Sequence, residues 1–241
     1  MLPFFLFGGG PTYWIVLLLT LAITGGAAMH VRSTYRRWAG VRNSSGMTGA
    51  QMARHLLDSV GLQHVGVDII DGELTDNYDP RDKTLHLSQG TAYNASVAAE
   101  CIAAHEIGHA IQDAKLFAPM RVRSAIVPAA NLGSQSAPLI IIAGVVLMGM
   151  RALTLGFEIA VIGLLLFGAV LLFHVVTLPV EVDASRRAMQ LLRQNGVLAG
   201  EEIKSARSVL NAAALTYLAA IAASALQILY WASLVFGSRR N

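Results

Sequence analysis

The chain has 241 residues, of which 54% are hydrophobic and 14% are charged. Soluble domains carry about 25% charged residues, so this composition excludes an ordinary water-soluble domain and indicates a membrane protein. The single cysteine excludes an internal disulfide, and a net charge of +3 gives no reason to expect a nucleic-acid partner.

The first apolar segment predicts a membrane anchor. Residues 11–29 contain no charged side chain and, as a helix, are long enough to cross a bilayer core of about 30 Å. A cleaved signal peptide begins with a positively charged region, but residues 1–28 contain no Lys or Arg. Arginines follow the segment instead, beginning with Arg32, which is typical of a retained anchor whose C-terminal end is cytoplasmic. We therefore assign residues 1–31 to an N-terminal transmembrane anchor.

Residues 32–124 predict a small α+β domain in water. A helix is expected between Thr48, its N-cap, and Gly61, its stop signal. Strands are expected at "VGVDII" (65–70) and "KTLHLS" (83–88). The stretch between these two strands is rich in turn-forming residues.

A second helix of this domain, predicted over residues 92–114, carries a candidate metal-binding motif. His105, Glu106 and His109 form the pattern HExxH. Side chains four residues apart project from the same face of a helix, so both histidines could hold one zinc ion. Glu106 is rotated by about 100° from His105, which places it outside the ligand set but near a water on the ion, as a general base. The alternative is a helix whose histidines only make polar contacts at a membrane surface.

Three further apolar segments predict the remaining spans. Residues 125–179 are expected to form a transmembrane hairpin, and residues 208–241 a C-terminal transmembrane helix. Of the 18 Lys and Arg residues, 15 lie in residues 32–124 and 180–207. Because basic residues gather on the cytoplasmic side of a membrane, both of these regions are expected in the cytoplasm, with the N- and C-termini outside.

A third metal ligand is expected away from the motif, because a catalytic zinc ion usually has three protein ligands and one open position. Glu181 is the best candidate, in the first turn of a helix predicted to begin near Thr177 and Pro179. Two spans separate Glu181 from His109, so the chain returns to the side of the membrane that it left. His174, near the end of the preceding span, is a rival third ligand.

Two further side chains near the candidate ligands are expected to have supporting roles. Asp183 lies two residues after Glu181 and points elsewhere on a helix, so it is expected to orient a histidine ligand rather than to bind the ion. Cys101 lies one turn before His105 on the same side of its helix, and we expect a small buried thiol with a structural role.

Three stretches of the chain together resemble a known family. They are "YDPRDKTLHLS" (78–88), "SVAAECIAAHEIGHAIQ" (96–112) and "LPVEVDASRRA" (178–188). In combination they are similar to the YugP-like family of neutral zinc metallopeptidases of bacterial membranes. The resemblance spans most of the chain, including the leading anchor and the order of the spans, and is much more specific than the HExxH pattern alone.

This resemblance implies a role for each residue of the motif. By likeness to the Glu-zincin branch, it implies zinc ligands at His105, His109 and Glu181 and a general base at Glu106. Many Glu-zincins carry an Asp four residues after the ligand Glu, whereas this chain has Ser185 at that position. The substrates that the resemblance implies are proteins or peptides of undefined sequence.

In such folds an edge strand beside the HExxH helix commonly pairs with an extended substrate. The predicted strand "KTLHLS" is where this contact is expected, through Thr84, Leu85, His86 and Leu87. Pairing through the backbone tolerates many substrate sequences, which suits a protease that clears unfolded or membrane proteins.

The sequence as a whole predicts a mainly α-helical membrane protein with about four transmembrane helices and a small cytoplasmic α+β zincin-like domain. We expect a membrane-anchored endopeptidase of the bacterial cytoplasmic membrane, with one Zn²⁺ per chain. One alternative is an intramembrane site-2-type protease, although Asp113 and Lys115 follow the motif too closely for a membrane span. The other is a scaffold or adaptor that binds zinc structurally or not at all.

Overall fold

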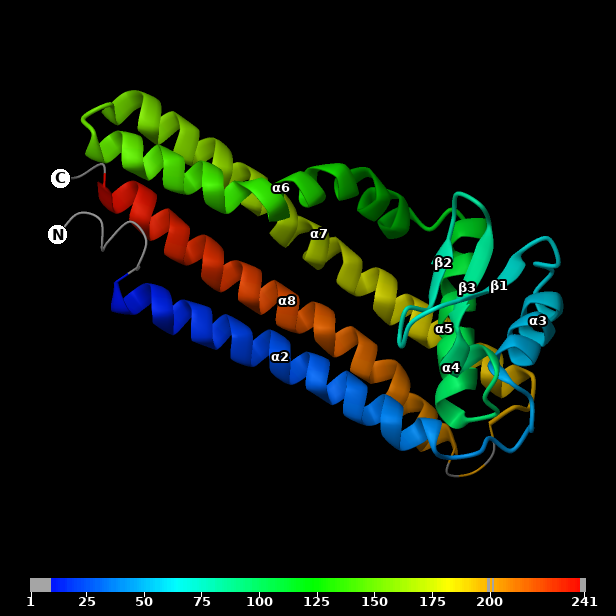
Figure 1. Ribbon diagram of the computed structural model, residues 1–241. Coiled ribbons are helices and arrows are strands. Elements are labelled where there is room, and N and C mark those ends of the chain that lie inside the picture. The colour runs from blue at the N-terminus through cyan, green and yellow to red at the C-terminus, as the bar shows by residue number, and fades with distance from the viewer. Residues whose placement is uncertain (1–9, 199, 201, 239–241) are drawn as a thin grey trace. The chain divides into compact units, whose positions relative to one another are not determined.

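The structure is a computed structural model that describes residues 10–198, 200 and 202–238. Residues 1–9 of the predicted anchor and residues 239–241 of the predicted last helix lie outside this part of the chain. The chain divides into two compact units, whose elements are labelled in Figure 1. Unit 1 comprises Met1–Ala27, Val122–Thr177 and Tyr217–Asn241, and unit 2 comprises Ala28–Arg121 and Leu178–Thr216.

Four long helices dominate the described part of the chain, and each contributes residues to both units. They are α2 (Pro11–Ala39), α6 (Ala118–Gly149), α7 (Leu153–Gln194) and α8 (Glu202–Ser238). All four are long and apolar enough to cross a membrane. The prediction of a mainly helical protein with four such helices is confirmed.

Within unit 1, helices α6 and α7 pack closely through small residues. A Cβ atom at Gly156 would lie 2.6 Å from the carbonyl oxygen of Gly144, and one at Gly163 would lie 2.6 Å from the side chain of Ile141. Ala160 at the same contact is fully buried. Small residues at a helix contact let two backbones approach, which is how helices associate in lipid.

One prediction about the region of Glu181 is wrong, because α7 has no break there. A new helix was expected to begin near Thr177 and Pro179, but α7 runs without a break from Leu153 to Gln194 and contains Pro179 in its interior. Proline removes one backbone hydrogen bond from a helix. Here the helix continues because buried residues recur at helical spacing beyond the proline, at Val180 and Ala184 among others.

Unit 2 contains a three-stranded sheet in the order β1-β3-β2. Strand β1 (Gly66–Ile70) is parallel to β3 (Thr84–Ser88), and β2 (Asn77–Asp79) is antiparallel to β3. Strands β1 and β3 confirm the two predicted strands. Strand β2 was not predicted, because it lies inside the stretch of turn-forming residues.

The prediction that "KTLHLS" forms an edge strand is wrong. Every one of Thr84, Leu85, His86 and Leu87 has a partner in β1, and Thr84 to His86 also pair with β2, so β3 is the central strand. The alternation that indicated a strand comes from Leu85 and Leu87, which are fully buried. Such alternation reports a buried face and does not distinguish a central strand from an edge. The edge strand that contacts the HExxH helix is β2.

Three helices complete unit 2, namely α3 (Gly49–Ser59), α4 (Gln89–Ala92) and α5 (Val97–Ala114). Thr48 is the N-cap of α3, as predicted. The Thr48 hydroxyl accepts from the Gln51 amide and the Gln51 side chain accepts from the Thr48 amide, which forms a capping box. The N-cap of α5 is Ser96, whose hydroxyl accepts a hydrogen bond from the backbone N–H of Ala99.

Helix α5 lies in the core of unit 2. Fully buried leucines from α3 and β3 belong to the same hydrophobic cluster as Ile107 of α5 and Leu192 of α7. This burial holds α5, the sheet and the end of α7 in one core. The motif residues His105, Glu106 and His109 lie on α5, within this core.

Candidate metal centre

Helix α5 places His105 and His109 one turn apart on the same face. Their ring centroids are 4.9 Å apart, and the rings are nearly perpendicular, with an interplanar angle of 87°. Both side chains are buried. The HExxH spacing therefore has the geometry that it predicts on a helix, with two imidazoles converging on one point.

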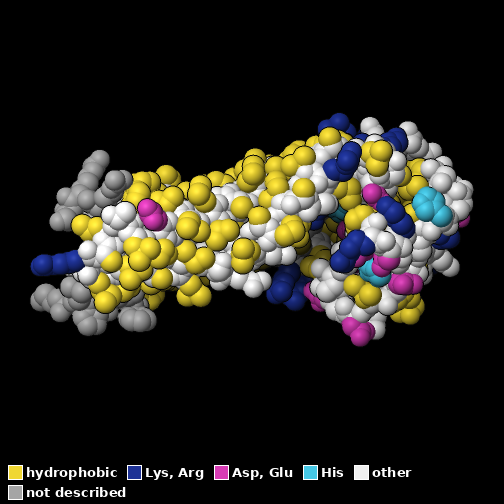
Figure 2. Space-filling model, turned by 90° about the horizontal axis from the view of Figure 1, so that it is seen from above, with side chains coloured by type: hydrophobic (Ala, Val, Ile, Leu, Met, Phe, Trp, Pro, Cys, Tyr) yellow, Lys and Arg dark blue, Asp and Glu magenta, His cyan; other side chains and the backbone are white. Residues whose placement is uncertain are grey.

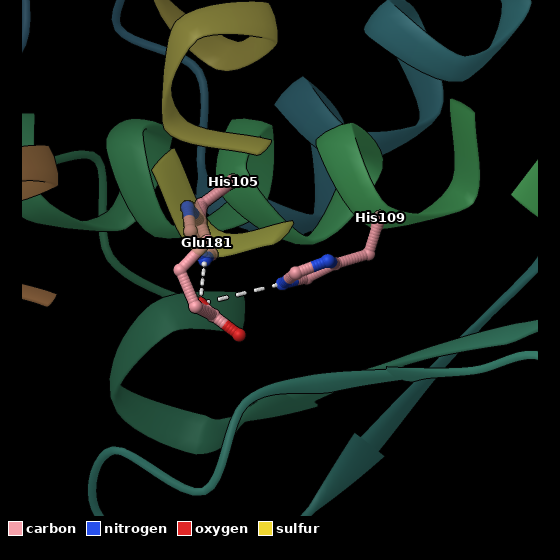
Figure 3. A group of neighbouring side chains, drawn as sticks. All are labelled: His105, His109 and Glu181. Atoms are coloured by element: carbon pink, nitrogen blue, oxygen red, sulfur yellow. Dashed lines mark hydrogen bonds and ion pairs between the residues drawn. The ribbon is translucent and has the colours of Figure 1, made fainter. Parts of the chain in front are cut away.

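Glu181 of α7 faces these two histidines (Figure 3). Its Oε2 atom lies 3.2 Å from His105 Nε2 and 3.6 Å from His109 Nε2. The three candidate ligand atoms all lie within 4.8 Å of one another. The structure thus brings together the three residues that the sequence suggested as a ligand set, from segments far apart in the chain.

Gly108 allows α5 and α7 to approach each other at this point. A Cβ atom there would lie 2.5 Å from the carbonyl oxygen of Ala184. Real Cβ atoms do not come so close to a carbonyl oxygen, so any other residue would push the helices apart. Since Ala184 follows Glu181 by three residues, this contact sets how far Glu181 stands from the histidines.

The three residues fit a zinc ion. Zinc binds imidazole nitrogen and carboxylate oxygen at about 2.0–2.2 Å, and four ligands around it form a tetrahedron whose edges are roughly 3.3 to 3.6 Å long. The distances of 3.2 Å and 3.6 Å from Glu181 to the two histidines match such edges. Two histidines and one glutamate would also leave the fourth position open.

Glu106 is held by the edge strand of the sheet. Its Oε2 accepts a hydrogen bond of 3.0 Å from the backbone N–H of Tyr78 in β2. Burial raises the pKa of Glu106 above its usual value, although His105 and His109 oppose this effect. Sequence reasoning missed this role of Tyr78, which belongs to the "YDPR" stretch.

The side chain of Tyr78 anchors β2 to the same helix. Its hydroxyl donates a hydrogen bond of 2.7 Å to Asp113 near the end of α5, and Lys83 also pairs with Asp113. Burial and this hydrogen bond raise the pKa of Tyr78, so the hydroxyl stays protonated and remains a donor. Strand β2 and helix α5 are therefore joined by hydrogen bonds from both the backbone and the side chain of Tyr78.

The outward-facing nitrogen of each histidine also has a partner. His109 Nδ1 lies 3.0 Å from Gln112 Oε1, and His105 Nδ1 lies 3.2 Å from the hydroxyl of Ser185. Asp183 accepts a hydrogen bond from the side-chain NH₂ group of Gln112, so Asp183 is linked to the ring of His109 through Gln112. Sequence reasoning missed Gln112, although its spacing of three residues from His109 places both on one helix face.

The carboxylates of the site favour a protonated His109 in the metal-free protein. Burial by itself lowers the pKa of His109, but Glu181 and Glu106 beside the ring outweigh it and leave this pKa above its usual value. Zinc binding requires the neutral imidazole, so binding must displace this proton and weakens in acid.

Two residues considered in the sequence are not part of this group. The described residues that could jointly hold a metal ion are His105, His109 and Glu181, without the rival His174. Cys101 is fully buried in α5, as expected for a structural thiol.

Comparison with known proteins gives one family and one curated relative. A family model described as "Putative neutral zinc metallopeptidase" matches residues 13–236. The chain is 36% identical over 228 residues to the "Putative membrane protease YugP" of Bacillus subtilis (strain 168), and the alignment covers 93% of this chain and 98% of that relative. No solved structure matches the chain significantly.

Proposed function

Since the chain belongs to the neutral zinc metallopeptidase family, we propose that it is a membrane-anchored zinc endopeptidase. The observation that carries this proposal is the buried group of His105, His109 and Glu181, with Glu106 next to His105 on α5. In this proposal the three residues of the group bind one Zn²⁺, and Glu106 is the general base.

The chemistry requires a water and a peptide carbonyl at the open position. A zinc ion held by His105, His109 and Glu181 would lower the pKa of a water at that position and polarise the carbonyl group. Glu106 takes a proton from the attacking water and later gives it to the leaving amine, so the water is divided between the two new chain ends. Two features prepare Glu106 for this exchange, namely the Tyr78 amide that orients its carboxylate and the burial that raises its pKa.

The four apolar helices and the distribution of basic residues support a cytoplasmic site in a bacterial membrane. Residues 32–124 and 180–207 contain 15 of the 18 Lys and Arg residues and would lie on the same side. We propose membrane or unfolded proteins as substrates. An extended substrate would pair with the edge strand β2, which contacts Glu106, rather than with the central strand β3.

The proposal is tested by zinc content and peptide cleavage in purified full-length protein. Glu106→Gln is expected to keep its zinc and to lose cleavage of casein by at least about 100-fold. Glu181→Ala is expected to lose both zinc and cleavage. Glu158→Ala, which removes an exposed carboxylate from the same helix as Glu181, is the matched control and should retain both.

Three outcomes would contradict the proposal. Undiminished cleavage by Glu106→Gln would exclude Glu106 as the base, and unchanged zinc affinity in Glu181→Ala would exclude Glu181 as a ligand. Zinc held by four protein groups in the wild type would leave no position for water and would favour the alternative of a scaffold or adaptor that binds zinc structurally.

Orientation needs a separate measurement. In sealed, right-side-out vesicles, a protease added outside should not cut residues 32–124, but should cut them once the vesicles are opened. Cleavage in intact vesicles would place the site on the outer face.

A further inference from the structure

The side chain of Gln112, behind His109, contacts three groups. Its Nε2 donates to the carbonyl oxygen of Val180 at 2.7 Å and to Asp183 Oδ2 at 2.9 Å. Its Oε1 lies 3.0 Å from His109 Nδ1. Gln112 is fully buried, so these three contacts take the place of water around its amide group.

The chemistry of these partners allows only one orientation of the amide. A carbonyl oxygen and a carboxylate are acceptors, so the NH₂ group must face Val180 and Asp183. A flipped amide would place its oxygen against two other oxygens in a buried site and would leave its NH₂ group facing the ring. The acceptor Oε1 therefore faces His109, whose Nδ1 must carry a hydrogen to complete the bond.

Asp183 is itself held in place by α7. Arg187, one turn further along this helix, donates from Nε to Asp183 Oδ2 at 2.6 Å. The contacts thus run from Arg187 through Asp183 and Gln112 to His109, from α7 to α5. Because the Val180 carbonyl belongs to the residue before Glu181, the same amide also joins His109 to the backbone that carries the third candidate ligand.

We propose that Gln112 is a positioning residue that fixes the ring of His109, with the hydrogen on Nδ1 and the lone pair of Nε2 directed at the ion. The inference deepens the proposed function and rests on it, because it takes His109 as a metal ligand. The contact of Gln112 is with the histidine ring, so it would act on the ion through His109.

Ser185 has the corresponding contact at His105. Its hydroxyl lies 3.2 Å from His105 Nδ1 and 3.3 Å from the carbonyl oxygen of Leu210. A hydroxyl has one hydrogen, and the Leu210 carbonyl can only accept it, so the Ser185 oxygen is left to accept from the ring. Both histidines thus direct Nε2 towards Glu181, through partners of different chemistry.

The main test is Gln112→Met, which keeps a side chain of similar length but removes the acceptor. Its zinc affinity, measured by competition with a chromophoric chelator, is expected to fall about 10- to 100-fold. Gln190→Met is the matched control, because Gln190 is exposed on α7, and its zinc affinity should equal that of the wild type. Equal zinc affinity in Gln112→Met and the wild type would overturn the proposal.

A second readout follows the ring hydrogen itself. In full-length protein with ¹⁵N-labelled histidine, the Nδ1–H signal of His109 should exchange slowly with water in the wild type and rapidly in Gln112→Met, with or without zinc. A purely structural role for Gln112 would lower thermal stability and leave this signal unchanged, and that result would overturn the proposal.

Variants of Asp183 keep the test open if Gln112→Met does not fold. Asp183→Ala removes one anchor of the Gln112 amide and should weaken zinc binding, whereas Asp183→Asn keeps an acceptor oxygen and should retain more affinity. Equal affinities in the wild type and both variants would overturn the anchoring role. A wild type that binds no zinc would overturn the proposed function, while the ring signal in the metal-free protein would still decide the role of Gln112.

Discussion

The two units place their apolar side chains in opposite ways. In unit 1, Leu139 and Leu165 are 67% and 70% exposed, whereas the small residues Ala137 and Ala160 are fully buried. In unit 2, Leu85 and Leu87 are fully buried instead. Figure 2 shows hydrophobic side chains over much of the visible surface of the long helices, while charged side chains and histidines gather on unit 2.

This difference agrees with the proposed arrangement, in which lipid surrounds unit 1 and water surrounds unit 2. Lipid tails are as apolar as leucine, so helices in lipid gain little by burying leucines and associate through close contact of small residues. Water drives large apolar side chains into a core. Close approach of helices through glycine nevertheless occurs in both units, at Gly156 in unit 1 and at Gly108 in unit 2. In unit 1 it joins apolar surfaces, whereas in unit 2 it brings together groups that can bind a metal ion.

The largest effect is expected for Gly108→Ala. A methyl group there would meet the Ala184 carbonyl oxygen at 2.5 Å, so α7 must move away and carry Glu181 with it. A displacement on the order of 1 Å can reduce catalysis about 100-fold, and we expect comparable losses of cleavage activity and of zinc affinity. Gly168→Ala serves as control, since a Cβ atom at Gly168 has no neighbour within 4 Å. Normal zinc binding by Gly108→Ala would show that the site tolerates a wider helix contact.

Gly156→Ala tests the corresponding contact in unit 1. The added methyl group would lie 2.6 Å from the Gly144 carbonyl oxygen and from the backbone nitrogen of Met148. Overpacking of this kind costs about 1–3 kcal/mol, which should lower the thermal unfolding midpoint in detergent. Zinc affinity should stay within about twofold of the wild type, because no candidate ligand moves. A matching loss of zinc affinity would show that the two units are coupled and that packing in unit 1 also controls the metal site.

Local sequence patterns were sufficient for several elements of unit 2. The Thr48 cap and the buried alternation at Leu85 and Leu87 act within a few residues, and α3 and β3 lie where these patterns predicted them. The convergence of His105 and His109 follows from helical spacing alone, whatever the rest of the fold.

Other features depend on contacts between distant segments, and no local pattern reports them. The three residues of β2 form a strand only because β3 lies beside them, and α7 continues through Pro179 because the core of unit 2 covers its later turns. The contacts of Gln112 and Ser185 with the histidines depend on the register of α5 against α7. For the same reason β3 could be recognised as a strand but not as the central one.

Glu100 is an exception to the pairing of buried polar groups in unit 2. Its carboxyl group is fully buried at the start of α5, and neither oxygen has a hydrogen-bond partner among the described residues. Burial, with Glu202 adding to the effect, raises the pKa of Glu100 to about 8. The folded protein therefore retains a proton that the unfolded chain releases above the usual pKa of glutamate. The contribution of Glu100 to the free energy of unfolding is fully present below that usual pKa and is lost as the pH rises to about 8.

Glu100→Gln should remove this loss of stability. Between about pH 6 and about pH 9 the free energy of unfolding of the wild type should fall by on the order of 2 kcal/mol more than that of the variant. Thermal unfolding midpoints in detergent across this range measure the difference, and Glu73→Gln, at an exposed glutamate, should behave like the wild type. Parallel curves for the wild type and Glu100→Gln would mean that the carboxyl group has a partner in solution.

The smallest effect is expected at the start of α3, where a single N-cap residue of unit 2 is changed. This helix has 11 residues and depends on Thr48 and Gln51 to satisfy the amides of its first turn. Thr48→Ala should cost about 1 kcal/mol, and Thr48→Ser should restore most of it, because serine presents the same oxygen to the Gln51 amide. Since α3 carries no candidate ligand, zinc affinity should not change in either variant. If Thr48→Ala weakened zinc binding as much as it lowered stability, the site would depend on the whole core of unit 2 rather than on the contact between α5 and α7.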